Sequence, residues 1–312
     1  MNRRSAIRSL LVAGAASCVG RALRAVPLGD SPDFVIHSDV RLVLLDVSVK
    51  HPGDGWVTGL SKGSFTVFED GARQDITVFA DNDIPVTVGL LVDNSRSMAP
   101  KRSEVLSAST TFIEESNPKD EIFVLNFNDT VKRGLPEPLL FSDDVHQLRA
   151  ALARGTPDGR TALNDAVIEG LQQLGQGRRD KKTLIVISDG GDNASRNNRR
   201  NMLEDVASSL STIYTIGLFN AGDADQDPAI LKKLARISGG LAYFPDDAAD
   251  MTAACRNIAK DIRTRYTIGY APRTGREGLL RRIRVRVTAP GHETLIARTR
   301  LSYRYEASNQ NP

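Results

Sequence analysis

Three oxygen-bearing side chains follow an apolar run at intervals of two residues. Asp93, Ser95 and Ser97 come directly after residues 88–92, a run typical of a strand that is buried on both faces of an α/β sheet. In such sheets, ligands bind just beyond the carboxyl ends of the strands. Alternate residues of an extended turn project to one side, so the three oxygens can face one small cation. The same loop is equally compatible with an Asp93 or a serine that only caps the next helix.

Two later segments carry further oxygen ligands. Thr161 lies at a loop-to-helix junction, and Asp189 directly follows the apolar run 184–187. Because the carboxyl ends of parallel strands meet at one edge of a sheet, Asp189 and Asp93 can lie side by side. We therefore expect one metal site built from Asp93, Ser95, Ser97, Thr161 and Asp189. Oxygen-only ligation favours Mg²⁺, Mn²⁺ or Ca²⁺ over zinc.

Other polar residues near these segments are expected to form the rim of the site or to cap helices. Three of them are Asn94, Arg160 and Asp192. For Asp189 itself the alternative is a turn-forming aspartate, because two glycines follow it.

The elements that must position these side chains alternate between strand and helix over residues 85–262. Strands are expected at 86–92, 121–126, 183–188, 212–218 and 241–244. Helices are expected at 101–116, 144–153, 162–174, 199–210, 228–237 and 248–263. Alternation at these lengths predicts an α/β fold with a doubly wound, mostly parallel sheet and helices on both of its faces.

The segments on either side of this region have β character instead. Residues 33–84 contain strand patterns at 42–49, 65–68 and 76–79, and residues 264–306 contain them at 266–270, 281–287 and 295–303. Arginines at 282, 284 and 286 alternate with apolar residues, as in an antiparallel sheet with one wet face. We expect the two segments to pair into a smaller β-sandwich-like domain, with the α/β domain at 85–263 inserted between them.

The amino terminus has the composition of an export signal. Residues 1–25 begin with Arg3, Arg4 and Arg8 and continue with an apolar stretch at 9–20, which is too short to span a bilayer. We expect a signal peptide and a protein that is periplasmic, cell-envelope or secreted. The general secretory route, a twin-arginine route and a lipid anchor at Cys18 all stay open, and Cys18 is the only expected attachment to a membrane.

Charge and composition exclude several other classes. The chain of 312 residues is 40% hydrophobic and 25% charged, which is typical of a folded soluble protein with one medium and one smaller domain. Removal of residues 1–25 changes the formal net charge from +3 to −2, so no nucleic-acid partner is expected. The four histidines are scattered without ligand spacing, and Cys255 is expected to be a buried free thiol. The arginine face at 282–286 is interpreted as a solvated sheet face, with recognition of anionic lipid, glycan or nucleic acid as the alternative.

The order D-x-S-x-S, then threonine, then aspartate resembles the von Willebrand factor type A (VWA) domain and its metal-ion-dependent adhesion site. The chain is similar to bacterial exported VWA-related proteins. This resemblance implies that Ser95, Ser97 and Thr161 ligate the ion directly, whereas Asp93 and Asp189 hold it through bound waters. Arg160 stands where many relatives have glycine, which changes access at the rim without removing a ligand.

The resemblance also implies a function. It predicts a non-catalytic, Mg²⁺- (or Mn²⁺- or Ca²⁺-) dependent adhesion module whose cation accepts a carboxylate from a partner protein. One alternative is a structural envelope protein with an unused metal site. Another is a Mg²⁺-dependent, phosphatase-like hydrolase, but that chemistry needs a second acid where this chain has Ser95. No residue is assigned a catalytic role.

Overall fold

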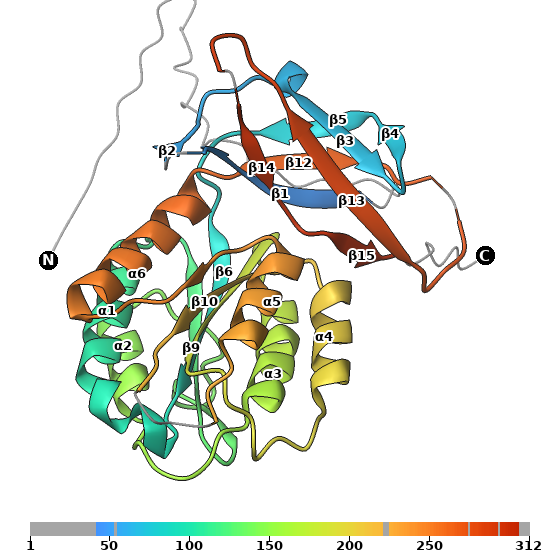
Figure 1. Ribbon diagram of the computed structural model, residues 1–312. Helices are drawn as coiled ribbons and strands as arrows, with labels where there is room; N and C mark the ends of the chain where they lie inside the picture. The colour runs from blue at the N-terminus through green and yellow to red at the C-terminus, as the bar shows by residue number, and fades with distance from the viewer. Residues whose placement is uncertain (1–41, 53–54, 221–224, 274, 293, 306–312) are drawn as a thin grey trace, which may run out of the picture. The chain divides into compact units, whose positions relative to one another are not determined.

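The computed structural model describes residues 42–52, 55–220, 225–273, 275–292 and 294–305. The expected signal peptide and Cys18 lie outside the described residues. Among the described residues, an α/β region is flanked in sequence by strands on both sides (Figure 1). None of the helices in this part of the chain has both the length and the apolar character that a membrane span needs.

A six-stranded sheet forms the centre of the α/β region, in the order β11-β10-β9-β6-β7-β8. Its strands are β6 (Val86–Asp93), β7 (Glu121–Phe127), β8 (Val131–Arg133), β9 (Lys181–Ser188), β10 (Thr212–Gly217) and β11 (Ala242–Tyr243). All neighbours pair in parallel except β8, which runs antiparallel to β7. Every residue of β6 is buried, which explains its apolar composition. The expected doubly wound, mostly parallel sheet is therefore confirmed.

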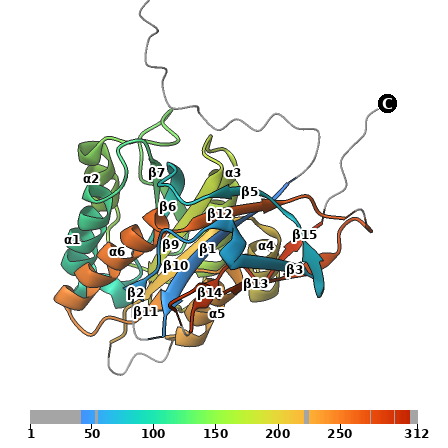
Figure 2. The ribbon, with the colours of Figure 1, turned by 90° about the horizontal axis from the view of Figure 1, so that it is seen from above.

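Two groups of helices cover the two faces of this sheet (Figures 1 and 2). One group is α1 (Arg102–Glu114), α2 (Val145–Ala153) and α6 (Ala248–Arg263). The other is α3 (Leu163–Gly175), α4 (Arg199–Ser208) and α5 (Pro228–Ser238). Asp144 and Asp227 cap α2 and α5 by accepting hydrogen bonds from backbone N–H groups of their first turns. Gly239, at φ 85°, ends α5 in the left-handed conformation that favours glycine.

The remaining strands form two antiparallel sheets. The first has the order β14-β1-β12-β5, with β2 also paired to β1, and the second has the order β15-β13-β3-β4. Their amino-terminal strands are β1 (Val43–His51), β2 (Gly55–Trp56), β3 (Phe65–Glu69), β4 (Ala72–Gln74) and β5 (Ile76–Ala80), with a 3₁₀ turn at Lys62–Ser64. Their carboxy-terminal strands are β12 (Tyr266–Tyr270), β13 (Leu280–Val287), β14 (Ile296–Arg298) and β15 (Ser302–Arg304).

Each of these sheets combines strands from both ends of the described chain. Val43 of β1 lies opposite Tyr270 of β12, and Val67 of β3 lies opposite Val285 of β13. Apolar residues of the two sheets share one buried cluster that is separate from the core of the α/β region. The flanking strands therefore build the expected smaller, sandwich-like β region.

One expected strand is wrong in its extent. The segment 295–303 forms two short strands, because β14 pairs with β1 of the first sheet whereas β15 pairs with β13 of the second. Between them the backbone passes so close to Gly239 that a Cβ atom there would lie 2.4 Å from the Thr299 carbonyl carbon. Leu301 N–H then donates to the Ile237 carbonyl at the end of α5. The crossing between sheets, rather than a change in local propensity, breaks the strand.

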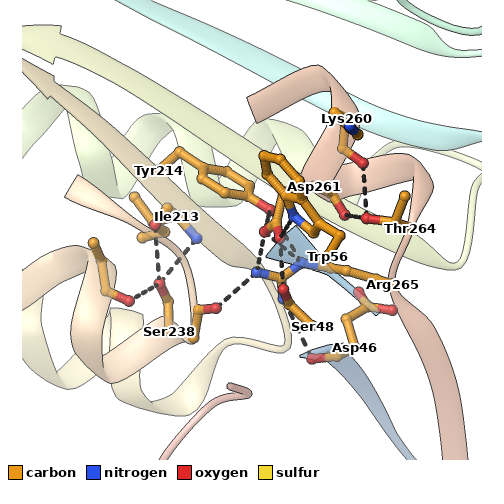
Figure 3. A network of polar contacts seen from close by, with 12 residues as sticks. Asp46, Ser48, Trp56, Ile213, Tyr214, Ser238, Lys260, Asp261, Thr264 and Arg265 are labelled. Atoms are coloured by element: carbon orange, nitrogen blue, oxygen red, sulfur yellow. Dashed lines mark hydrogen bonds and ion pairs between the residues drawn. The ribbon is translucent and has the colours of Figure 1, made fainter. Parts of the chain in front are cut away.

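A buried polar network joins the β region to the α/β region (Figure 3). Asp261 Oδ1, near the end of α6, accepts hydrogen bonds from Ser48 Oγ at 2.6 Å and Trp56 Nε1 at 2.7 Å. Its Oδ2 accepts hydrogen bonds from Tyr214 Oη at 2.5 Å and from Arg265 Nη2 at 2.9 Å. Four elements, β1, β2, β10 and α6, therefore meet at one carboxylate.

The charges of this network are balanced within it. Arg265 is 3% exposed and Asp261 is fully buried, and Arg265 Nη2 also donates to the Gly239 carbonyl at 2.8 Å. Burial alone raises the pKa of Asp261, but the Arg265 charge and the three hydroxyl and indole donors outweigh it and lower that pKa to about 2. The carboxylate is therefore ionised in the folded protein at neutral pH.

Candidate metal centre

The loop after β6 brings two hydroxyls together. Asp93 is the last residue of β6, and a 3₁₀ helix (η2, Arg96–Lys101) begins directly after Ser95. The Ser95 backbone N–H donates to Asp93 Oδ1 at 2.8 Å, which bends the chain back over the strand end. Ser95 Oγ and Ser97 Oγ lie 3.1 Å apart.

Asp189 reaches the same point from the neighbouring strand. It follows β9, which pairs in parallel with β6 so that Val92 lies opposite Ile187. Ser97 Oγ donates to Asp189 Oδ2 at 2.5 Å, and the other carboxylate oxygen accepts a hydrogen bond from Gly191 N–H at 2.9 Å. The structure thus brings Ser95, Ser97 and Asp189 into one hydrogen-bonded group.

Asp93 lies beneath this group and is buried, at 1% exposure. Its Oδ2 accepts a hydrogen bond from Ser188 Oγ at 2.6 Å. Burial raises the pKa of Asp93 to about 7, assisted by the nearby charge of Asp189 and opposed by the hydrogen bonds from Ser188 and Ser95. Ser188 was not singled out in the sequence, because its role depends on the register between β6 and β9.

Thr161 lies in an adjoining loop that is tied to the other two. Its backbone N–H donates to Asn193 Oδ1 at 2.9 Å, and its carbonyl accepts a hydrogen bond from Asn193 N–H at 2.9 Å. The same loop is joined to the loop after β6, because Arg96 N–H donates to the Gly159 carbonyl at 3.2 Å. Thr161 is 5% exposed, and it makes no hydrogen bond to the four other predicted ligands.

The three residues predicted for the rim take different places. Arg160 is exposed and pairs with Asp129 at 3.0 Å. Asp192 caps α3, because its carboxylate accepts hydrogen bonds from Asn164 N–H at 3.1 Å and Asn164 Nδ2 at 2.6 Å. Asn94 is not at the rim: it is buried at 2% exposure and donates to Asn126 Oδ1 at 3.0 Å. The Asn94 side chain lies beneath the loop, because adjacent residues of an extended segment point to opposite sides.

The donor set fits a small, hard cation. Ligands bound to Mg²⁺ at about 2.1 Å and at right angles lie about 3 Å apart, and the Ser95 and Ser97 hydroxyl oxygens are 3.1 Å apart. Asp93 and Asp189 are both buried, and neither pairs with a cationic side chain among the described residues. Two buried carboxylates with no balancing charge favour binding of a cation.

No second metal site competes with this one in the part of the chain that the structure describes. That part holds no cluster of three or more His, Cys, Asp or Glu side chains that could bind a metal ion. Cys255 is a buried free thiol, and burial raises its pKa to about 12. Cys255 is therefore protonated at neutral pH and does not serve as a metal ligand or a nucleophile.

Residues 88–191, about a third of the chain, match the family model of the von Willebrand factor type A domain. The chain contains a VWA domain. The sheet order and the two helical layers described above belong to this fold.

One relative by sequence and several solved structures are similar to this chain. An uncharacterized protein of Synechocystis sp. is 26% identical over 167 residues, which are 53% of this chain and 39% of the relative, so the chain spans about two fifths of that relative's length. A VWA protein from Catenulispora acidiphila has a TM-score of 0.51 at 14% identity, over 86% of this chain and 74% of its own. Proximal thread matrix protein 1 of the mussel byssus, with a zinc-occupied MIDAS motif, has a TM-score of 0.51 at 12% identity, over 64% and 50%. At these identities the structural likeness concerns the VWA fold.

Proposed function

We propose that this protein is an exported, non-catalytic adhesion module that binds a protein partner through a divalent cation. Ser95, Ser97 and Thr161 would ligate Mg²⁺, or Mn²⁺ or Ca²⁺ in its place, and Asp93 and Asp189 would hold the ion through bound waters. The single observation that carries the proposal is the contact of Ser95, Ser97 and Asp189 at the ends of two adjacent strands. The ion would offer an open position to a carboxylate of the partner.

Two exposed ion pairs at the edge of the centre support an acidic partner. Arg96 pairs with Asp158 at 3.1 Å, and Arg160 pairs with Asp129 at 3.0 Å. Exposed pairs of this kind contribute only about 0–1 kcal/mol each, so either arginine can turn to a partner's carboxylate at small cost. The partner is accordingly a protein with an acidic side chain, and no role for nucleic acid or catalysis is proposed.

Metal binding is tested first, by calorimetric titration of the full chain with Mg²⁺ and Mn²⁺. We expect one saturable site, and we expect Asp189→Asn to weaken it about 10–100-fold, the usual effect of losing a partner just outside the metal's ligands. Asp143→Asn is the matched control, because Asp143 is exposed and lies outside the centre. A flat titration of the native chain would support the structural alternative instead.

Partner binding is tested with envelope extracts. Immobilised protein should retain a partner in Mg²⁺, release it in EDTA and fail to retain it as Asp189→Asn, because the bridging cation is then lost or weakly held. Retention that is unaffected by EDTA and by this substitution contradicts the proposal. A screen with generic phosphate esters gives the remaining check, since metal-dependent turnover that Asp93→Asn abolishes would favour the hydrolase alternative.

A further inference from the structure

A basic groove lies away from the candidate metal centre, between α5 and the strands β13 and β14. It has a volume of about 370 Å³, which is in the range of small-ligand sites. On the α5 side it is bounded by Lys232 and Arg236, and on the β side by Arg284, Arg298, Thr299 and Arg300. We call these six residues and the space between them the basic groove.

The charge of the basic groove is unbalanced. Five of its lining residues are cationic, and none of the described residues that line it is acidic. Arg300 is already used, because its guanidinium donates to the carbonyls of Ser209 and Ser211. Lys232 lies over the Phe244 ring, and neither Arg236 nor Arg284 forms an ion pair with another described residue. Such a concentration of one sign attracts an anion.

Two residues that line the basic groove each have a buried hydrogen-bond donor without a partner among the described residues. Arg298 Nη1 and Thr299 Oγ1 are both buried without a hydrogen bond to any described residue, and Thr299 is only 9% exposed. Buried polar groups in native proteins are nearly always satisfied, so an exception indicates a bound water, ion or ligand. The two residues are consecutive, and both line the same space.

The backbone around these donors is fixed rather than free. Arg298 ends β14, where it lies opposite Ser48 of β1. Thr299 and Arg300 then pass against Gly239, too close for a Cβ atom on that glycine. The carbonyls of Ile237 and Gly239 at the end of α5 accept hydrogen bonds from Leu301 N–H and from Arg265, which ties this segment to the helix. The site is therefore held in place before a ligand arrives.

We propose that the basic groove binds a phosphate group, with Arg298 and Thr299 as its buried donors and Lys232, Arg236 and Arg284 as its charged margin. Arginine and hydroxyl donors suit tetrahedral oxyanions, which accept several hydrogen bonds at once. The phosphate could be free or could be the headgroup of an anionic lipid, since both present the same chemistry. The site is independent of the proposed metal centre.

The test is calorimetric titration of the full chain with inorganic phosphate at fixed ionic strength, with EDTA present so that phosphate cannot bind through a metal ion. We expect saturable binding that Thr299→Val weakens about tenfold, the value of one hydrogen bond to a charged group. Thr299→Val should fold at least as well as the native chain, because it removes a buried hydroxyl that has no partner. Unaltered thermal unfolding together with weaker phosphate binding separates a ligand contact from a structural one.

A matched pair of arginines supplies the control. Arg282 and Arg284 are both exposed on β13, but only Arg284 lines the basic groove. Arg284→Gln should weaken phosphate binding, whereas Arg282→Gln, with the same loss of charge, should leave it within about twofold of the native value, because Arg282 does not line the basic groove and its exposed charge acts on the phosphate only through solvent. Equal effects of the two substitutions, or no saturable phosphate binding by the native chain, would overturn the proposal.

The source of the phosphate is distinguished with vesicles. Phosphatidylcholine vesicles with and without phosphatidylglycerol are sedimented with the native chain. Binding to the anionic vesicles that inorganic phosphate displaces, and that Thr299→Val reduces, assigns the site to a lipid headgroup. Phosphate binding without vesicle binding assigns it to a soluble phosphate ligand.

Discussion

At the scale of single residues, Thr161 differs from the other proposed ligands in the way it is held. Its backbone N–H and carbonyl are both bonded to Asn193, whereas Ser95, Ser97 and Asp189 are bonded to one another through their side chains. Its place therefore depends on the loop after β9. The Thr161 hydroxyl takes no part in these bonds and is available to bind a ligand.

This difference gives a prediction for Thr161 alone. Thr161→Val should weaken Mg²⁺ binding about tenfold or more, because it removes the oxygen and keeps the shape, while Thr161→Ser should retain the native affinity. Thermal unfolding in EDTA should be nearly the same for both variants, since the backbone bonds to Asn193 persist. Titration calorimetry measures the first effect; equal Mg²⁺ affinities for the valine and serine variants would remove Thr161 from the site.

The residue types of the candidate centre could be predicted from the sequence, because hard oxygen donors placed after buried strands are recognisable without coordinates. The residues that hold these ligands in place could not be predicted. Ser188 bonds Asp93 across two strands, and Asn193 holds Thr161 from a different loop. Both are common polar residues whose roles depend on strand register and loop path, which no local pattern records. For the same reason the place of Asn94 could not be predicted: it is buried and donates to Asn126 of β7.

At the scale of elements, the end of α6 is fixed by charge as well as by apolar packing. Asp261 and Arg265 are four residues apart, a spacing typical of ion pairs on helices, yet both are buried. Two of the other partners, Ser48 and Trp56, are 213 and 205 residues away from Asp261 in the sequence. The sequence predicts the helix accurately, but it cannot predict that these distant donors meet its last turn.

The lowered pKa of Asp261 predicts a dependence of stability on pH. Its value of about 2 in the folded protein lies below the ordinary 3.8, so its contribution is complete above about pH 4 and is lost as the pH falls towards 2. Asp261→Asn should lower the free energy of unfolding by about 3 kcal/mol at neutral pH, because it leaves Arg265 buried without its counter-charge. The deficit should shrink as the pH falls through this window.

Urea unfolding at a series of pH values measures this effect. Asp250→Asn is the matched control, because Asp250 is an exposed aspartate in the first turn of the same helix; it should change stability by no more than about 1 kcal/mol. A deficit in Asp261→Asn that stays constant from neutral pH to pH 2 would contradict the assigned pKa.

At the scale of the whole described chain, the VWA domain and the flanking β region are joined by the network at Asp261. Residues from β1 and β2 contribute donors to it, and Arg265 also donates to the carbonyl of Asp46 in β1. Arg263 adds a second link by pairing with Asp83, which precedes β6, and with Asp120. We therefore expect the two regions to unfold together.

The protein contains its own reporter for this prediction. Trp56 is the only tryptophan of the chain and lies in the β region, whereas all six α-helices of the described residues lie in the VWA domain. In urea, tryptophan fluorescence and helical circular dichroism should change at the same midpoint. Separate midpoints for the two signals would show that the network does not couple the regions.

The pairing of β1 with β12 and of β3 with β13 has a further consequence, for the order in which a newly made chain can complete its structure. Until β12 and β13 emerge, β1 has only the short strand β2 beside it and β3 has only β4, and the helical domain between the two segments is finished earlier. The edges that later pair with β12 and β13 stay open throughout that interval, when open strand edges are most prone to aggregation. A ribosome stalled before residue 264 would thus carry a folded helical domain preceded by strands whose open edges are prone to aggregation.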